Sequence, residues 1–336
     1  MSTFIVAELS ANHNHDLELA KKTILAAKKA NADGVKLQTY TADTLTIDCD
    51  KPHFHTASGS LWEGTTLYEL YRQAYTPWEW HDELFRYGES LGLVMFSTPF
   101  DYSAVDFLEG LGNPIYKIAS FEAMDFPLIA YAAAKGKPMI ISLGMLTLEE
   151  ISEAIETCHK AGNHDITLLV CTSEYPAPPE DAQLLKIQDI VSRFGVKVGL
   201  SDHTLGSAVA SAAVALGACI IEKHFVLDRK RGGVDSAFSM MPMEFKQMAD
   251  DIRVIEKAVA APDYSRVSEG RAYSRSLFAV KNIKRGDLFT SENLRSIRPG
   301  HGLHPKYYPE VLRCVATRDI DRGTPITWEM VAQNNK

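Results

Sequence analysis

The sequence has few cysteines, and none of them are spaced to form a metal knuckle or a disulfide frame. There are five, an odd number, and no two stand in a C-x-x-C arrangement. This usage is typical of reduced thiols in the cytosol. The start of the chain also lacks a basic segment followed by a long apolar stretch, so we expect no signal peptide. Together these absences predict a cytoplasmic protein.

Long hydrophobic runs and an excess of positive charge are missing as well. No apolar window reaches the length of about 18 residues that a membrane helix needs, so no membrane partner is expected. The 336 residues include 35 Lys and Arg against 43 Asp and Glu, a formal net charge of -8. An acidic balance of this kind argues against a nucleic-acid partner, although lysines within a pocket would still bind small anions.

Short apolar segments alternate with amphipathic stretches along most of the chain. The strand candidates are Phe4–Glu8, Gly34–Gln38, Val94–Thr98, Ile115–Ala119, Met139–Ser142, Ile166–Cys171, Val196–Ser201 and Cys219–Glu222. Eight strand–helix alternations predict an α/β fold, a (β/α)8 TIM barrel over residues 1–259. A doubly wound sheet is the alternative, but it would show a glycine fingerprint after the first strand, and none is present.

The last part of the chain has a different organisation. The alternating pattern ends in residues 260–273, whose composition is typical of a linker. Within residues 274–336, the segment Ala279–Gly286 is repeated as Ala316–Gly323. The repeat predicts a small, compact, β-rich domain with pseudo-twofold character.

Polar residues gather where the predicted strands end. The interior of a barrel is normally filled with branched apolar side chains, and catalytic groups collect at the C-terminal ends of its strands. Here nearly every strand ends in polar or charged residues, namely Glu8, Lys36, Gln38, Ser97, Thr98, Lys117, Ser120, Ser142, Thr172, Ser173, Ser201, Asp202, His203, Glu222, Lys223 and His224. Their convergence predicts an active site at this mouth, because such groups are costly to bury without partners or a ligand.

Two histidines end neighbouring strands in this scheme. His203 follows the seventh strand and His224 ends the eighth. Adjacent strands lie about 4.8 Å apart, so both imidazoles would reach one metal ion at about 2.1 Å. Water and substrate oxygens would complete the shell. The alternative is that each is only a hydrogen-bonded histidine at a strand end.

Two lysines face the same mouth. Lys36 and Lys117, surrounded by several hydroxyls, suit a small ligand that carries phosphate and carboxylate groups. Alternatively, they are structural ion-pair partners of Glu8 or Glu222. Glu8 is the candidate acid or base, unless it only neutralises Lys36.

A second metal signature follows the first strand. His13 and His15 form the His-x-His that also begins metal-dependent amidohydrolases. Those barrels need further histidines after strands five and six, where this chain has Ser142-Leu143-Gly144 and Cys171-Thr172-Ser173. An amidohydrolase is therefore a remote alternative, and we expect His13 to line the site and His15 to be a loop residue.

Motifs along the barrel resemble those of the sialic acid synthase family. They are Ala7–His13, Val35–Thr39, Phe96–Phe100, Tyr116–Ser120, Cys171–Pro176, Gly199–Thr204 and Glu222–Phe225. Residues 276–331, with Ile297–Gly300, resemble the antifreeze-like (SAF) domain that follows the barrel in that family. The resemblance implies a TIM barrel followed by a small β-rich SAF domain. It also implies an enzyme that joins phosphoenolpyruvate to an N-acylated amino sugar and releases phosphate.

The resemblance also implies roles for individual residues. His203 and His224 would bind a divalent metal ion, which is Mn2+, Mg2+ or Co2+ in such enzymes. Catalytic roles fall to Glu8, Lys36, Lys117 and Asp235. Substrate contacts fall to Asn12, His13, Gln38, Thr98, Ser120, Ser142, Ser173, Ser201 and Arg298. Arg298 would reach from the SAF domain of one subunit into the barrel of its partner, which implies a domain-swapped homodimer.

Some positions depart from the neuraminic acid pattern. Ser10, Leu143 and Gly233–Ser239 resemble instead the branch of the family that makes pseudaminic acid. The substrate of that branch is 2,4-diacetamido-2,4,6-trideoxy-L-altrose. An aromatic such as Trp62 would suit its 6-deoxy methyl group, or would simply pack within its loop. N-acetylneuraminate and legionaminate synthases are the near alternatives.

Overall fold

The computed structural model describes residues 2–59, 61–265 and 269–334. The chain divides into two compact units, Met1–Ala260 and Ala261–Lys336. Within the linker predicted at 260–273, residues 266–268 lie outside the described residues, and Glu269–Tyr273 forms the 3-10 helix η5. Each unit has its own hydrophobic core.

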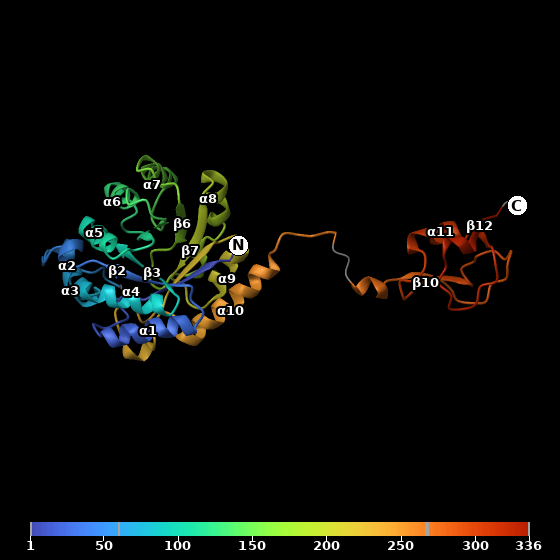
Figure 1. The fold of residues 1–336 in the computed structure, drawn as a ribbon, viewed down its shortest axis with the longest axis horizontal. Coiled ribbons are helices and arrows are strands. Elements are labelled where there is room, and N and C mark those ends of the chain that lie inside the picture. The colour runs from blue at the N-terminus through green and yellow to red at the C-terminus, as the bar shows by residue number, and fades with distance from the viewer. Residues whose placement is uncertain (1, 60, 266–268, 335–336) are drawn as a thin grey trace. The chain divides into compact units, whose positions relative to one another are not determined.

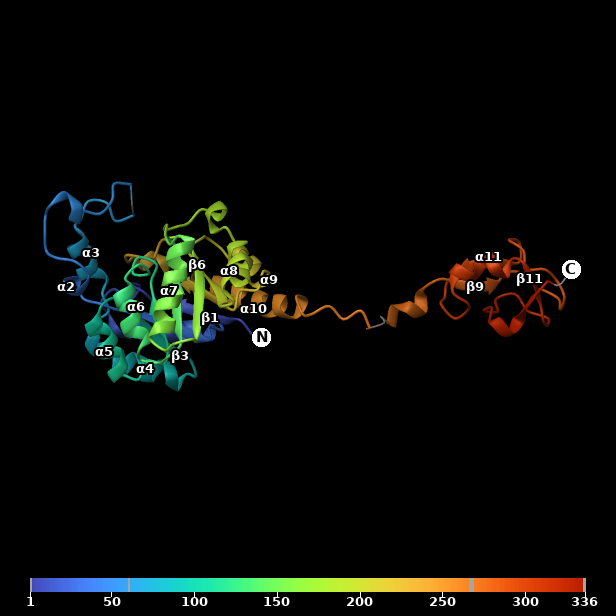
Figure 2. The ribbon, with the colours of Figure 1, turned by 90° about the horizontal axis from the view of Figure 1, so that it is seen from above.

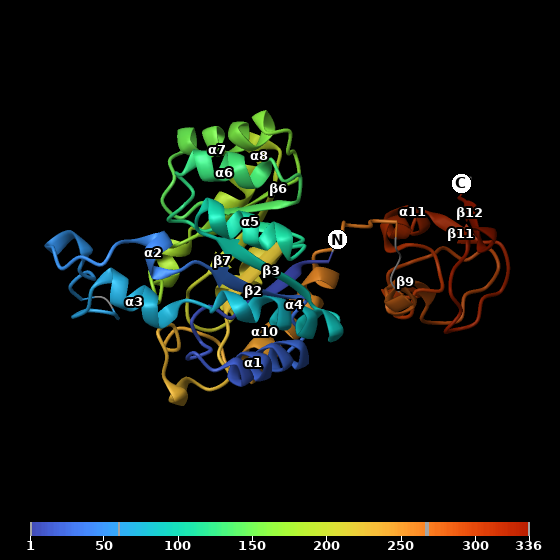
Figure 3. The same ribbon diagram turned by 60° about the vertical axis from the view of Figure 1, so that its left-hand side comes forward.

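The first unit is a closed barrel of parallel strands that pair in chain order from β1 to β8 and back to β1 (Figures 1 and 3). The strands are β1 Phe4–Glu8, β2 Gly34–Thr39, β3 Val94–Pro99, β4 Tyr116–Ile118, β5 Met139–Ser142, β6 Ile166–Cys171, β7 Lys197–Asp202 and β8 Ile220–His224. The predicted TIM barrel is confirmed, and the doubly wound alternative is wrong because β1 and β8 are paired rather than left as edges.

Helices surround the strands (Figure 1). They are α1 Leu17–Lys29, α4 His81–Ser90, α5 Tyr102–Gly110, α6 Phe126–Ala133, α7 Leu148–Lys160, α8 Lys186–Phe194, α9 Ala208–Ala215 and α10 Pro242–Ala258, with 3-10 turns η3 Pro179–Ala182 and η4 Arg229–Arg231. Local sequence fixes several of their starts. Asp16 accepts hydrogen bonds from the first backbone amides of α1, and Thr147 forms a capping box with Glu150 in α7. In the described part of the chain, no helix has both the length and the apolar character needed to span a bilayer.

The connection from β2 to β3 is unusually long. It carries α2 Ala42–Leu45, η1 Pro52–Phe54, α3 Leu67–Ala74 and η2 Trp78–Trp80 before α4. Figure 2 shows the α2–α3 segment projecting from the barrel. The segment leaves the C-terminal end of β2, so it belongs to the mouth where TIM barrels carry their active sites.

The barrel interior changes character along the strands. Successive side chains of a strand point to opposite faces, so residues two apart share a side. One inner layer is an apolar cluster of Val6, Phe96, Ile140, Leu169 and Ile220. Two residues further on, the same strands carry Glu8, Thr98, Ser142, Cys171 and Glu222. The interior is therefore apolar on the N-terminal side and polar toward the mouth.

One glycine allows two strands of the mouth to approach closely. A Cβ atom on Gly199 of β7 would lie 2.5 Å from the Ile220 carbonyl oxygen of β8 and 2.7 Å from Leu169 Cδ2. Such distances are well inside van der Waals contact, so only glycine fits at this position. The same two strands carry the histidines predicted to bind metal.

The second unit contains two antiparallel strand pairs. β9 Ser276–Ala279 pairs with β10 Leu294–Ile297, and β11 Cys314–Ala316 pairs with β12 Val331–Gln333. Short helices complete it, at η6 Pro305–Tyr307, α11 Tyr308–Val311 and η7 Trp328–Met330.

The repeat in the sequence has a structural counterpart in this unit. The backbone amide of Ile283 donates to the Ile320 carbonyl, and that of Ile320 donates to the Ile283 carbonyl, both at 2.8 Å. Gly286 donates to Ala316 at 2.7 Å, and the equivalent Gly323 donates to Ala279 at 2.8 Å. These reciprocal bonds show the pseudo-twofold arrangement that the repeat predicted.

Candidate active site

Two lysines and two carboxylates form one buried cluster inside the mouth of the barrel. Lys36 Nζ of β2 forms an ion pair with Glu8 Oε2 of β1. Glu222 Oε1 of β8 lies 3.6 Å from Lys117 Nζ of β4 and 3.9 Å from Lys36 Nζ. Lys36 also donates to Thr98 Oγ1 at 3.1 Å. Lys36 and Lys117 therefore face the same mouth and also form ion pairs with the carboxylates, so both arrangements considered from the sequence are present. Glu222 lies within ion-pair distance of both lysines.

Burial and charge give the two carboxylates different acidities. Burial raises the pKa of Glu8 to about 7, against the lowering influence of Lys36. Burial also acts to raise the pKa of Glu222, but Lys117 and Lys36 outweigh it, and the net shift is downward. Glu222 is therefore the ionised partner of the lysines. A pKa near neutrality would suit Glu8 to act as a general acid or base.

Hydroxyl groups line the same space. Ser201 Oγ donates to Glu222 Oε1 at 3.1 Å, and the hydroxyls of Ser120 and Ser173 lie 2.8 Å apart. Ser142 Oγ is buried and has no hydrogen-bond partner within the described residues. Buried hydroxyls are normally paired, so a donor of this kind is suited to an oxygen of a bound anion.

The two histidines meet as predicted. The rings of His203, after β7, and His224, at the end of β8, have centroids 5.4 Å apart. His203 Nδ1 lies 2.8 Å from the Thr172 carbonyl oxygen. A carbonyl only accepts, so Nδ1 carries the hydrogen and Nε2 keeps its lone pair. His224 Nδ1 is buried without a hydrogen-bond partner in the described part of the chain.

These side chains fit a divalent metal ion, which the family resemblance implies. Burial lowers the pKa of His203 to about 4 and that of His224 well below its usual range, so both imidazoles are neutral at pH 7. Neutral imidazole is the ligand form, and a hydrogen bond on the far nitrogen is the usual way to orient it. Residues 2–59, 61–265 and 269–334 contain no group of three or more His, Cys, Asp or Glu side chains arranged to hold a metal. Water and substrate oxygens would therefore supply the other ligands.

Asp235 lies beside this pair. Its Oδ2 is 3.8 Å from His224 Nδ1 and accepts a hydrogen bond from Ser10 Oγ. Burial raises the pKa of Asp235, and the Ser10 hydroxyl acts in the opposite direction. The carboxylate is thus placed next to the predicted metal ligands, where it can orient a bound substrate.

Asn12 and His13 make contacts that stabilise the β1–α1 loop. Asn12 Nδ2 donates to the Phe225 carbonyl at 3.0 Å and to Ser239 Oγ at 2.9 Å. His13 Nδ1 accepts from the backbone amide of His15 at 3.1 Å, and its Nε2 lies 3.2 Å from a threonine hydroxyl, Thr76 Oγ1. Both ring nitrogens of His13 are engaged, so a direct bond to substrate would require one of these contacts to break.

The last two residues predicted to contact the substrate, Gln38 and Arg298, lie in different units of the chain. Gln38 is half-buried at the end of β2, in register with Thr98 of β3. Arg298 is exposed and belongs to the second unit, just after β10. Its contact with the barrel of a partner subunit remains a prediction.

Comparisons with known proteins decide the family. A model described as the NeuB family matches residues 23–264, which is most of the chain. The chain belongs to the NeuB family. A model of the SAF domain matches residues 274–332. Both matches confirm the resemblance seen in the sequence.

Individual members of the NeuB family give a finer comparison. The chain is 46% identical to the pseudaminic acid synthase of Helicobacter pylori over 327 residues, 96% of either chain. It is 36% identical to the N,N'-diacetyllegionaminic acid synthase of Legionella pneumophila over 340 residues, 98% of this chain and 95% of that one. The crystal structure of an N-acetylneuraminic acid synthetase from Leptospira borgpetersenii superposes with a TM-score of 0.72 at 30% identity, and covers 81% of this chain and 90% of that one.

Several residues of this NeuB-family site were not predicted from the sequence to act on the substrate. Glu222 was considered only as an ion-pair partner of the lysines, although it lies two residues before His224 on one strand and so faces the same side. Glu122, after β4, is half-buried, and its Oε2 has no hydrogen-bond partner among the residues that the structure describes. Burial raises the pKa of Glu122 to about 7. The Tyr175 ring lies 4.3 Å from that of His203, and Phe238 lies 4.9 Å from His224. Loop residues such as these carry no strand-end signal.

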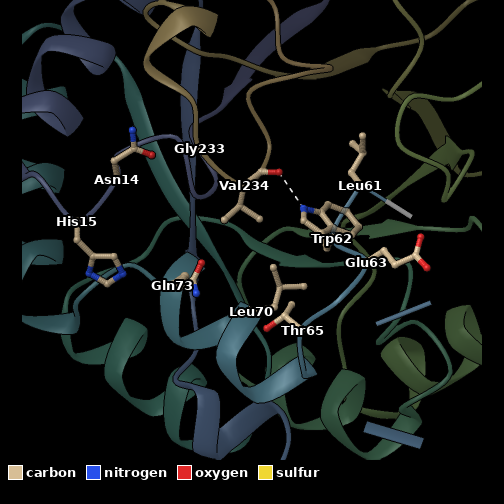
Figure 4. Close-up of a pocket in the computed structure, with 10 residues that line it drawn as sticks. All are labelled: Asn14, His15, Leu61, Trp62, Glu63, Thr65, Leu70, Gln73, Gly233 and Val234. Carbon is tan, nitrogen blue, oxygen red and sulfur yellow. Dashed lines mark hydrogen bonds between the residues drawn. The ribbon is translucent and has the colours of Figure 1, made fainter. Parts of the chain in front are cut away.

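A pocket of about 520 Å3 opens beside the site (Figure 4). It is lined by Asn14, His15, Leu61, Trp62, Glu63, Thr65, Leu70, Gln73, Gly233 and Val234. The Trp62 indole donates to the Val234 carbonyl at 2.8 Å, and its ring is 6.0 Å from that of Tyr175. The pocket is therefore connected through Tyr175 to the two histidines predicted to bind metal.

A second buried ion pair lies behind the histidines. Lys223 Nζ of β8 donates to Asp202 Oδ2 of β7 at 2.8 Å and to the Thr204 carbonyl at 2.6 Å. Because side chains alternate along a strand, this pair points to the helix side of the barrel while its neighbours point inward. It joins the ends of the two strands that carry His203 and His224.

We predict that Asp202→Asn destabilises the barrel by about 3 kcal/mol, because Lys223 would stay buried without a counter-charge. Urea unfolding followed by circular dichroism measures this loss. Asp189→Asn is the matched control, since Asp189 pairs with Arg193 on an exposed helical surface and should leave the midpoint nearly unchanged. Equal midpoints for the two variants would contradict a structural role for the pair.

Proposed function

We propose that this chain is a cytoplasmic enzyme that condenses phosphoenolpyruvate with 2,4-diacetamido-2,4,6-trideoxy-L-altrose, giving pseudaminic acid and phosphate. The 46% identity over 96% of both chains to a pseudaminic acid synthase supports this sugar. Identity falls to 36% for a legionaminic acid synthase of similar length. Family membership and the engaged nitrogens of His13 give an amidohydrolase no support.

One of the sequence departures lies within the site itself. Ser10 donates its hydroxyl to Asp235 Oδ2, and its backbone is left-handed with φ 46°. A glycine at this position would leave Asp235 without that hydrogen bond. Ser10 thus supports a pseudaminic-type site in which Asp235 has a fixed orientation.

Phosphoenolpyruvate carries one carboxylate and one phosphate, and the buried cluster suits both. Lys36 and Lys117 supply positive charge in a water-poor setting, where charge-assisted hydrogen bonds are strong. The Ser142 hydroxyl at the end of β5, which has no partner among the described residues, supplies a further donor, as do Thr98 of β3 and Ser120 after β4. These residues would hold the anion at the bottom of the mouth, beneath the histidines.

The lysines cannot act as a Lewis acid, and His203 and His224 would provide the binding site for a metal ion that can. Held by His203 and His224, a divalent ion (Mn2+, with Mg2+ or Co2+ as alternatives) would polarise the sugar aldehyde and a water molecule. The chain itself fixes the two imidazoles in their neutral form. Tyr175 and Phe238 shield them from bulk solvent.

The reaction balances with one water molecule. C3 of phosphoenolpyruvate forms a bond to the aldehyde carbon, and the aldehyde oxygen takes up a proton. The water oxygen then bonds to C2 and loses one proton. As the C2–O bond to phosphate breaks, the remaining C2 hydroxyl becomes the ketone, and its proton passes to the released phosphate. Glu8, with a pKa of about 7 and an ion pair to Lys36, is placed to move one of these protons.

The proposed reaction is tested by phosphate release from phosphoenolpyruvate with Mn2+. Wild-type protein should release phosphate with the diacetamido sugar and should stop when EDTA is added. His203→Ala should lose at least about a hundredfold in rate, because a metal ligand and its Lewis acidity are removed.

His159→Ala, a substitution on the exposed face of α7, is the control and should keep full activity. Phosphate release with N-acetylmannosamine alone would retain the reaction but contradict the pseudaminic assignment. A fully active His203→Ala protein would contradict the metal site.

We also propose that the protein is a domain-swapped homodimer in which Arg298 enters the barrel of the partner. Large apolar side chains are exposed on loops at the mouth, with Leu61 51%, Phe121 56%, Met145 43% and Leu205 61% accessible. Exposed apolar groups gathered on one face are typical of a surface that another protein surface covers.

Mixing two inactive variants tests the swap. Arg298→Ala and His203→Ala should each be inactive alone. After subunit exchange, a mixed dimer would contain one intact site, so a statistical mixture should regain roughly a quarter of wild-type activity. No regained activity after verified exchange would mean that each arm serves its own barrel or none.

A further inference from the structure

The pocket beside the active site is built by segments that are far apart in the sequence. Its walls come from the β1–α1 loop, the loop before α3, α3 itself and the β8–α10 loop. Figure 4 shows Gln73 and Leu70 projecting from one helix toward the segment that carries Gly233 and Val234. A volume of about 520 Å3 is within the range of small-molecule sites.

Two contacts hold these segments together. The Trp62 indole donates to the Val234 carbonyl at 2.8 Å, which ties the loop before α3 to the β8–α10 loop. Gly233 allows the second contact, because a Cβ atom there would lie 2.7 Å from Asn14 Oδ1. The backbone at Asn14 and His15 is left-handed, with φ 47° and 51°. Left-handed residues other than glycine persist where their surroundings fix them, and they cluster at ligand sites.

The lining offers polar groups on one side and apolar groups on the other. Neither the Gln73 amide nor the His15 ring makes a hydrogen bond with any described residue. Leu70, Trp62 and Val234 supply an apolar surface beside them. This pairing of free amide and imidazole groups with apolar side chains matches an acetamido group, which has an N–H, a carbonyl and a methyl.

The lining does not suit an anion. It contains no lysine or arginine among the described residues. Its one acidic side chain, Glu63, accepts from Ser58 Oγ at 2.7 Å and from the Gly59 amide at 2.8 Å, so it is already used to shape the loop. Phosphate and carboxylate groups therefore suit the lysine cluster, whereas this pocket suits a neutral group.

We propose that this pocket binds the C4 acetamido group of the sugar, and that Gln73 and His15 thereby determine substrate specificity. The inference rests on the function proposed above. C1 of the sugar reacts at the histidine pair, and the C2 substituent is adjacent to it, whereas C4 lies three carbons further along the chain. The Tyr175 ring spans this interval, because it is 4.3 Å from the His203 ring and 6.0 Å from that of Trp62.

Two variants and two sugars test the proposal. The sugars are the diacetamido substrate and its analogue with a hydroxyl in place of the C4 acetamido group. Gln73→Ala should lower kcat/KM for the diacetamido sugar about fivefold through KM, the effect of one lost hydrogen bond. Leu70→Trp, which fills the pocket, should lower it at least about thirtyfold. Both variants should leave the KM for phosphoenolpyruvate and the turnover of the C4-hydroxy analogue unchanged.

Gln188→Ala, on the exposed face of α8, is the matched control and should behave as wild type. Equal losses for the two sugars, or no loss for either, would overturn the proposed subsite while leaving the enzyme intact. Absence of phosphate release by the wild-type protein with any amino sugar would instead remove the proposed function, and this subsite with it.

Discussion

The carboxylate of Glu222 is the constraint on which the active site depends. It lies inside the barrel, within 3.9 Å of two lysines, and its Oε1 also accepts from Ser201. Removing a lysine from water costs several kcal/mol unless a nearby counter-charge offsets this cost. Glu222, with Glu8 beside Lys36, offsets much of this cost: the pKa of Lys36 is raised, whereas burial still lowers the pKa of Lys117. The two lysines are thus held in a site with little water before any anion binds. Electrostatic groups fixed in advance need little reorganisation during a reaction.

Because side chains alternate along a strand, the polar groups of β8 that face the active site are separated from the charged group that stabilises the barrel. Glu222 and His224 face the interior, while Lys223 between them faces the helices and pairs with Asp202. Three consecutive residues of β8 thus belong to the proposed anion site, to the contact between β7 and β8, and to the proposed metal site. A shift of β8 by one residue would move all three to the wrong face, so the closed barrel fixes the active site as well as the fold.

The barrel and much of its candidate active site could be predicted from the sequence. Strand ends are visible as polar residues that interrupt β-branched runs, which is how Glu8, Lys36, Lys117, His203 and His224 were found. Ion-pair partners are less visible, because the role of Glu222 depends on which strands are neighbours. The pocket was not predicted as a site, although Trp62, His15 and Gly233–Ser239 were named separately, because it is formed largely by loops whose positions no periodicity specifies. The role proposed for Arg298 rests on the family resemblance alone, because it involves a second subunit.

We propose that Lys36 and Lys117 form a preformed site for phosphoenolpyruvate, and calorimetric titration with phosphoenolpyruvate in the absence of any sugar would measure this binding. With Mn2+ present, wild-type protein and the exposed control Lys197→Met should bind phosphoenolpyruvate with equal affinity. Lys117→Met, shown to be folded by its thermal transition, should bind at least about tenfold more weakly, because a charge-assisted contact is lost. Unchanged affinity in Lys117→Met would contradict a preformed anion site, since the buried lysine would then serve only to neutralise Glu222.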